Sequence, residues 1–129
     1  METPMTLFHR ASLLAAVLWA PAGMADVNAE LNGILEANAT SAAFARICDE
    51  EPVSEQLKSS TMLLLTVHGI PAQNIQLGSA KFNDVMRREI ANFHSAKNVD
   101  CMARVKEARE RLAFTQGVIQ AGRRDVPNN

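Results

Sequence analysis

The sequence predicts an all-α fold, a small bundle of four to five helices stapled by one disulfide. Apolar residues recur every three or four positions along most of the chain, which is the spacing of one helix face. One short apolar run could form a strand, but no second segment is strong enough to pair with it. The chain contains two cysteines, the number needed for a single bridge.

Residues 1–25 have the pattern of a secretory signal peptide. A short N-terminal region ending in Arg10 is followed by an apolar stretch of 10 residues. This stretch is too short to cross a bilayer, which takes about 20 residues. Small residues suit a cleavage site before Asp26, with cleavage after Ala22 as the alternative. We therefore expect an exported protein, periplasmic or secreted, without a membrane span after cleavage. The competing interpretation is a buried N-terminal helix of a cytosolic protein.

Residues 26–129 are predicted to form a single helical domain. Their length fits one modest hydrophobic core. The chain has no tyrosine, and residues 26–129 contain four phenylalanines and no tryptophan. Such a composition suits close packing of small helices. Residues 122–129 are expected to form a loose polar tail.

The most apolar stretch after the signal peptide spans residues 54–69, and we expect it to be the central helix that the others cover. It contains an apolar run from Met62 to Val67, and a helix without a polar face belongs in the interior. Ser54 is the candidate N-cap and Gly69 the candidate stop. The alternative is a short buried strand, because the threonines and the valine are β-branched.

Two helices are predicted before this stretch, at residues 26–37 and 41–48. They could equally be one helix bent at Gly33 or Asn38. The polar segment before Pro52 ends the second helix, because proline disfavours helix at the residue that precedes it.

A helix capped by Ser79 is predicted after the central stretch, with an apolar stripe from Phe82 to Phe93. Residues 72–78 are ambiguous between a loop and a short helix.

The last helix is predicted to begin at Cys101, with Asp100 or Asn98 as its cap. Its apolar residues follow at helical spacing, and Gly117 and Gly122 are expected to fray its end.

Cys48 and Cys101 are predicted to form an intramolecular disulfide. Each cysteine continues the apolar face of its predicted helix, so we expect both to point at the core. An even cysteine count in an exported protein favours a bridge. The alternatives are a redox pair, a metal site that includes His68 or His94, and an intermolecular bridge. No CxxC motif and no tightly spaced ligand pair supports the first two.

Charge is distributed unevenly between the two halves of the predicted domain. Residues 26–75 contain seven acids and two bases, whereas residues 76–129 contain ten bases and six acids. Several of these bases have an acid four residues away, the spacing of helix ion pairs. We therefore expect the two halves to neutralise each other and do not expect nucleic-acid binding. The candidate partner surface consists of Arg87, Arg88, Asp49, Glu50 and Glu51.

No catalytic, cofactor or metal site is predicted. The chain has no phosphate-binding loop, dinucleotide fingerprint or metalloprotease motif. His68 and His94 are the candidates for acid–base chemistry, because histidine titrates near neutral pH. Asn38 begins an Asn-Ala-Thr glycosylation sequon.

In outline, the layout of a signal peptide, about 100 helical residues and one long-range disulfide resembles periplasmic acid-stress chaperones. It also resembles periplasmic immunity proteins that block cell-wall-degrading toxins, and small secreted proteins of alphaproteobacteria. The resemblance covers the architecture alone. We expect a non-enzymatic role in binding another protein, because the sequence shows no convergent nucleophile, base and acid and few polar residues at predicted core positions. The alternatives are a helical carrier of a small apolar ligand and a small hydrolase that uses His68 or His94.

Overall fold

The computed structural model describes residues 25–93 and 99–124, which form four helices and no strand. These are α2 (Ala25–Ile47), α3 (Glu51–Val67), α4 (Ala72–Phe93) and α5 (Cys101–Arg124). The predicted all-α class is confirmed for this part of the chain. The predicted signal peptide lies outside the described residues except for Ala25, which begins α2.

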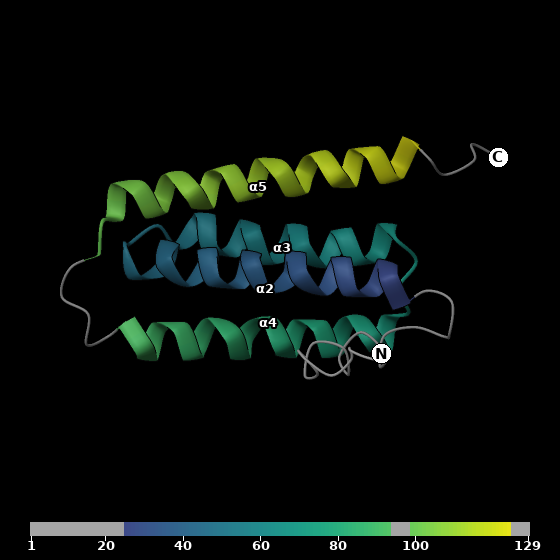
Figure 1. The fold of residues 1–129 in the computed structure, drawn as a ribbon, viewed down its shortest axis with the longest axis horizontal. Helices are drawn as coiled ribbons and strands as arrows, with labels where there is room; N and C mark the ends of the chain where they lie inside the picture. The colour runs from purple at the N-terminus through teal and green to yellow at the C-terminus, as the bar shows by residue number, and fades with distance from the viewer. Residues whose placement is uncertain (1–24, 94–98, 125–129) are drawn as a thin grey trace, which may run out of the picture.

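The four helices lie nearly parallel or antiparallel, and each runs opposite to the one before it (Figure 1). Helices α4 and α5 lie on opposite sides of the pair formed by α2 and α3 (Figure 1). Helix α2 packs against each of the other three, whereas α3 packs mainly against α2 and α5. Helix α2 is therefore the most extensively packed helix, and the prediction that residues 54–69 form the centre is confirmed only in part, because α3 shares the middle with α2 and contacts α4 lightly.

Helix α2 is continuous through Gly33 and Asn38, so the alternative of two separate helices is excluded. Much of its length is buried, and alanine and serine account for five of the eleven described residues that it buries. Small side chains let neighbouring helices approach closely, so a helix of modest hydropathy can occupy the middle of the bundle. The fully buried apolar residues of α2 are Leu35, Ala39, Ala42, Ala43 and Ala45.

Three helices are joined by hydrogen bonds to the buried side chain of Asn38 in α2. Its Nδ2 donates to Thr61 Oγ1 of α3 and to Thr115 Oγ1 of α5, both at 2.8 Å. Its Oδ1 accepts a hydrogen bond of 3.0 Å from Arg111 Nε. Burial lowers the pKa of the Arg111 guanidinium, and the nearby Glu107 carboxylate opposes that shift. Asn38 is fully buried, so its sequon is not open to glycosylation in the folded protein.

Helix α3 begins at Glu51, three residues before the predicted cap. The helix can begin there because proline is tolerated in the first turn, where Pro52 lies. Ser54 is therefore inside the helix, and it is buried. The apolar run is buried on one side only: Leu64 and Leu65 are fully buried, whereas Leu63 is 40% exposed.

Helices α2 and α3 end with the same hydrogen-bond pattern. At the end of α3, Gly69 has φ +79° and the Ile70 N–H donates to the Leu65 carbonyl, which confirms Gly69 as the stop. At the end of α2, Asp49 has φ +62° and the Glu50 N–H donates to the Ala45 carbonyl. An aspartate thus occupies a position that usually favours glycine.

Helix α4 begins at Ala72, so the ambiguous segment is helical and Ser79 is not its cap. The predicted stripe is confirmed in part, because Phe82 and Val85 are buried. Lys81 ties α4 to α2: its amine donates to Asn32 Oδ1 at 2.6 Å and forms an ion pair of 3.0 Å with Glu36.

The predicted disulfide is present. Cys48 and Cys101 are bonded across 53 residues, with their Cα atoms 5.5 Å apart, and join the end of α2 to the start of α5. Cys101 is exposed and Cys48 is only partly buried, so the expectation that both point at the core is wrong. The bridge is at the edge of the bundle because both residues lie at helix ends.

Helix α5 is capped as predicted, with Asp100 Oδ1 accepting the Ala103 N–H at 3.1 Å. It continues to Arg124, so the predicted polar tail does not begin at residue 122. Gly122 does not end the helix. An added Cβ there would lie 2.9 Å from Val67 Cγ1, so glycine permits a close approach of α5 to α3.

Candidate functional site

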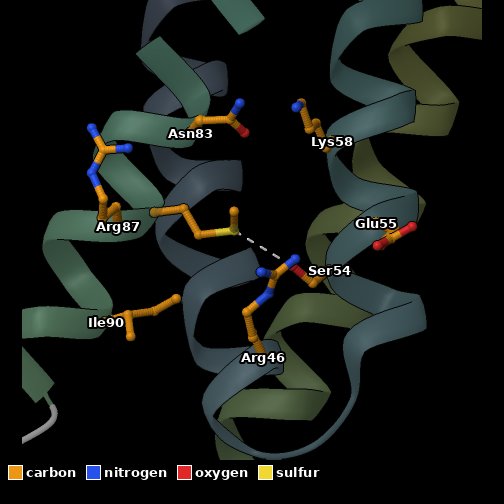
Figure 2. A pocket seen from close by; sticks show the side chains of 8 residues that line it. Arg46, Ser54, Glu55, Lys58, Asn83, Arg87 and Ile90 are labelled. Atoms are coloured by element: carbon orange, nitrogen blue, oxygen red, sulfur yellow. Dashed lines mark hydrogen bonds between the residues drawn. The ribbon is translucent and has the colours of Figure 1, made fainter. Parts of the chain in front are cut away.

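A groove of about 550 Å³ lies between α3 and α4, near the C-terminal end of α2 (Figure 2). Three elements supply its walls, so no single segment of the sequence forms it. The lining residues are Arg46 of α2, Ser54, Glu55 and Lys58 of α3, and Asn83, Met86, Arg87 and Ile90 of α4.

The groove exists because α4 packs mainly against α2 and only lightly against α3. The facing side chain on α3 is the small Ser54, whose hydroxyl donates to the Met86 sulfur at 3.6 Å, drawn as the dashed line in Figure 2. This contact joins the α3 and α4 walls of the groove. Met86 and Ile90 supply apolar surface along the α4 side.

The groove carries more positive than negative charge. Its cations are Arg46, Lys58 and Arg87, and its one acid is Glu55. Arg87 already donates to Asp84 at 2.9 Å. Arg46 and Lys58 form no ion pair or side-chain hydrogen bond with any residue that the structure describes. Two cations are therefore available for a ligand.

The two available cations lie toward opposite ends of the groove. In Figure 2, Lys58 extends toward Asn83 on α4, while Arg46 lies beside Ser54, nearer to Ile90. Asn83 and Ile90 are seven residues apart on one helix, which corresponds to about 10 Å or two turns. Glu55 points away from the groove (Figure 2). The arrangement suits a ligand with more than one acidic group and an apolar part between them.

The groove lacks the parts of a hydrolytic site. None of its lining residues is a histidine. The Ser54 hydroxyl donates its hydrogen bond to the Met86 thioether and not to a base. Nucleophilic catalysis needs a base within hydrogen-bond reach of the hydroxyl.

The two histidines considered for chemistry lie elsewhere. His68 is at the end of α3, where its Nδ1 donates to the Leu64 carbonyl oxygen at 3.0 Å. Its ring lies against Gly122 of α5, so its position is explained by helix capping and packing. His94 lies outside the described residues. In residues 25–93 and 99–124, no cluster of three or more histidine, cysteine or acidic residues could hold a metal ion.

The structure divides the candidate partner surface. Arg87 lines the groove, and Arg88 lies next to it and donates to Asp84 at 3.1 Å. Glu50 instead forms an ion pair of 2.9 Å with Arg109 of α5. Asp49 and Glu51 are exposed near the α2–α3 turn.

Sequence reasoning missed Arg46, Lys58, Met86 and Ile90 as site residues. A signal for two of them was present, because Arg46 and Lys58 are the only bases among residues 26–75. Isolated bases in an acidic segment would normally be assigned to ion pairs with their neighbours. The structure shows instead that both are without such partners among the described residues.

In comparisons with known proteins, no family model, no curated protein and no solved structure matches this chain. Among the described residues, none of the four helices combines the length and apolarity that a bilayer-spanning segment requires.

Proposed function

We propose that this chain is an exported, non-enzymatic helical protein that acts by binding another protein through the groove between α3 and α4. The observation that carries the proposal is the pair of available cations, Arg46 and Lys58, beside the apolar surface of Met86 and Ile90. Charged groups without partners at the edge of an apolar groove suit recognition of an oppositely charged surface.

Export is the second part of the proposal. The Cys48–Cys101 bridge is compatible with an oxidising compartment such as the periplasm. Mass spectrometry of the protein from cells should find an N-terminus at Asp26 or, as the alternative, at Gly23. An intact Met1 would contradict export.

The role as a binder is compatible with either a chaperone-like or an immunity-like activity. A chaperone would bind many unfolded partners weakly, whereas an immunity protein would bind one partner tightly. The groove accounts for contact with a partner in both cases, and the range of captured partners would distinguish them.

The carrier of a small apolar ligand is the second candidate, because the groove volume lies within the range of small-molecule sites, about 300–1,000 Å³. The cations count against a purely apolar ligand. An apolar ligand would leave Arg46 and Lys58 partly desolvated without a partner, which costs free energy.

The test is capture of partners from periplasmic extract with the exported protein as bait. Reversing the groove charges with Arg46→Glu and Lys58→Glu should abolish capture of the specific partner. The control carries Lys106→Glu and Arg123→Glu, two exposed positions of α5 with the same change in net charge. Equal capture by both double variants would contradict the groove as the contact site.

A further inference from the structure

We propose that the groove between α3 and α4 recognises an acidic amphipathic α-helix of the partner, with carboxylates at positions i and i+7 and apolar side chains at i+3 and i+4. This inference rests on the proposed function and adds the chemistry of the partner segment. It follows from the shape of the groove, the spacing of its cations and the position of its apolar surface.

The shape favours a helix. The walls of the groove are two antiparallel helices, and a third helix can lie along such a groove with one face inward. On α4 the lining positions are Asn83, Met86, Arg87 and Ile90, which form one face over two turns. A partner helix of matching length would also contact the groove over about two turns.

The spacing of the cations sets the partner's acidic positions. Lys58 lies at the Asn83 end and Arg46 lies toward the Ile90 end (Figure 2). Asn83 and Ile90 lie about 10 Å apart along α4, and two carboxylates seven residues apart on a partner helix span the same length, so one carboxylate would face each end of the groove. A ligand with one acidic head group, such as a fatty acid, would satisfy only one of them. This difference favours an acidic protein segment over a single-headed amphiphile.

The apolar surface sets the positions between the acids. Met86 lies midway between Asn83 and Ile90, and its flexible thioether adapts to differently shaped side chains. Residues i+3 and i+4 of a helix lie on the same face as i and i+7. Leucine at these two positions would therefore contact Met86 while the acids reach the cations.

The probe is a fluorescein-labelled, alanine-based peptide of 14 residues that contains Glu-x-x-Leu-Leu-x-x-Glu, and binding to the exported protein is measured by fluorescence anisotropy. We expect saturable binding in the micromolar range that weakens with added salt. Replacing both glutamates of the peptide with glutamine should weaken binding about 10-fold or more. Sodium decanoate, a single-headed amphiphile, should displace the peptide only poorly.

The protein variants locate the contact. Lys58→Glu should weaken binding about 10-fold or more, and a peptide with lysine in place of one glutamate should restore it. The paired control is Arg46→Gln against Arg88→Gln: Arg46 is an available cation that lines the groove, whereas Arg88 donates to Asp84 and does not line it. We expect only Arg46→Gln to weaken binding. Circular dichroism checks that each variant is folded, and Lys58→Gln replaces the charge reversal if Lys58→Glu is not.

Three results would overturn the inference. They are the absence of saturable binding, equal binding of the glutamate and glutamine peptides, and displacement by decanoate as strong as by unlabelled peptide. If the peptide fails while groove charge reversal still abolishes partner capture from extract, the partner segment is wrong and the proposed function stands. If partner capture is insensitive to the groove variants, the proposed site itself fails.

Discussion

Replacing Asn38 with alanine should destabilise the protein more than any other single asparagine substitution in the described helices. The change removes two buried hydrogen bonds, to Thr61 and Thr115, and the acceptor of the Arg111 Nε–H. The two neutral bonds contribute about 1 kcal/mol each and the bond from the cation about 1.5 kcal/mol. The higher helix propensity of alanine offsets about 0.5 kcal/mol. The expected loss in the free energy of unfolding is therefore about 2–3 kcal/mol.

Part of the network limits this loss. The hydroxyl protons of Thr61 and Thr115 are donated to backbone carbonyls of their own helices, at 2.6 and 2.8 Å, so neither donor is orphaned by the substitution. Arg111 is only partly buried, so water can solvate its guanidinium. The destabilisation should consequently stay below the values of about 3–5 kcal/mol seen when a buried charge loses its partner.

The assay is urea denaturation followed by far-ultraviolet circular dichroism, with Asn83→Ala as the control. Asn83 lies on the wall of the groove and is only partly buried, so its replacement should change stability by less than about 0.5 kcal/mol. The melting temperature of the Asn38 variant should fall by roughly 10 °C or more. A loss below about 1 kcal/mol would show that the three-helix link contributes little. A double-mutant cycle with Asn38→Ala and Thr115→Val tests the hydrogen bond between these two residues. If that bond contributes, the loss in the double variant should be smaller than the sum of the two single losses.

Three further predictions concern the disulfide, the core and a helix end. Thiol titration of the purified protein, denatured without reductant, should find no free thiol, and reduction should cost about 4 kcal/mol for a loop of this length. Two free thiols would contradict the bridge. Leu64→Ala should cost about 2–5 kcal/mol, whereas Leu63→Ala should cost less than about 1 kcal/mol, because the Leu63 side chain points about 100° away around the helix and is exposed. Equal losses would show that α3 is misplaced. Gly69→Ala should cost about 1 kcal/mol through backbone strain alone, because an added Cβ there meets no atom within 4 Å. Gly33→Ala, in the middle of α2, should instead stabilise the protein slightly. Stabilisation by both substitutions would contradict the strained turn at Gly69.

Local features were predictable from the sequence. The helical class follows from apolar spacing, which is set by the geometry of each helix and needs no tertiary contact. Asp100 caps α5 and Gly69 ends α3 as predicted, because capping depends on a few neighbouring residues. The pairing of the cysteines was also determined, since two cysteines allow one intramolecular connectivity.

The extensive packing of α2 was not predictable from apolarity. The strongest apolar run lies in α3, yet α2 is the most extensively packed helix because small residues such as Ala39 and Ala42 allow close packing from several sides. A hydropathy pattern gives most weight to large apolar side chains, whereas a helix that is packed on several sides needs small side chains so that its neighbours can approach closely. Asn38 illustrates the same point, because its burial depends on donors and acceptors from α3 and α5 that are distant in sequence.

The groove was decided by tertiary structure alone. Arg46, Lys58 and Met86 belong to three helices, and each has an ordinary local explanation as a surface charge or a core residue. Only the placement of α4 mainly against α2 opens a gap beside α3 and leaves two cations at its edges without partners among the described residues. The sequence by itself determined the helices, several of their ends and the bridge, because those depend on short-range geometry. The helix packing decided which side chains share a surface, because that depends on side-chain volumes and hydrogen bonds between segments far apart in the chain.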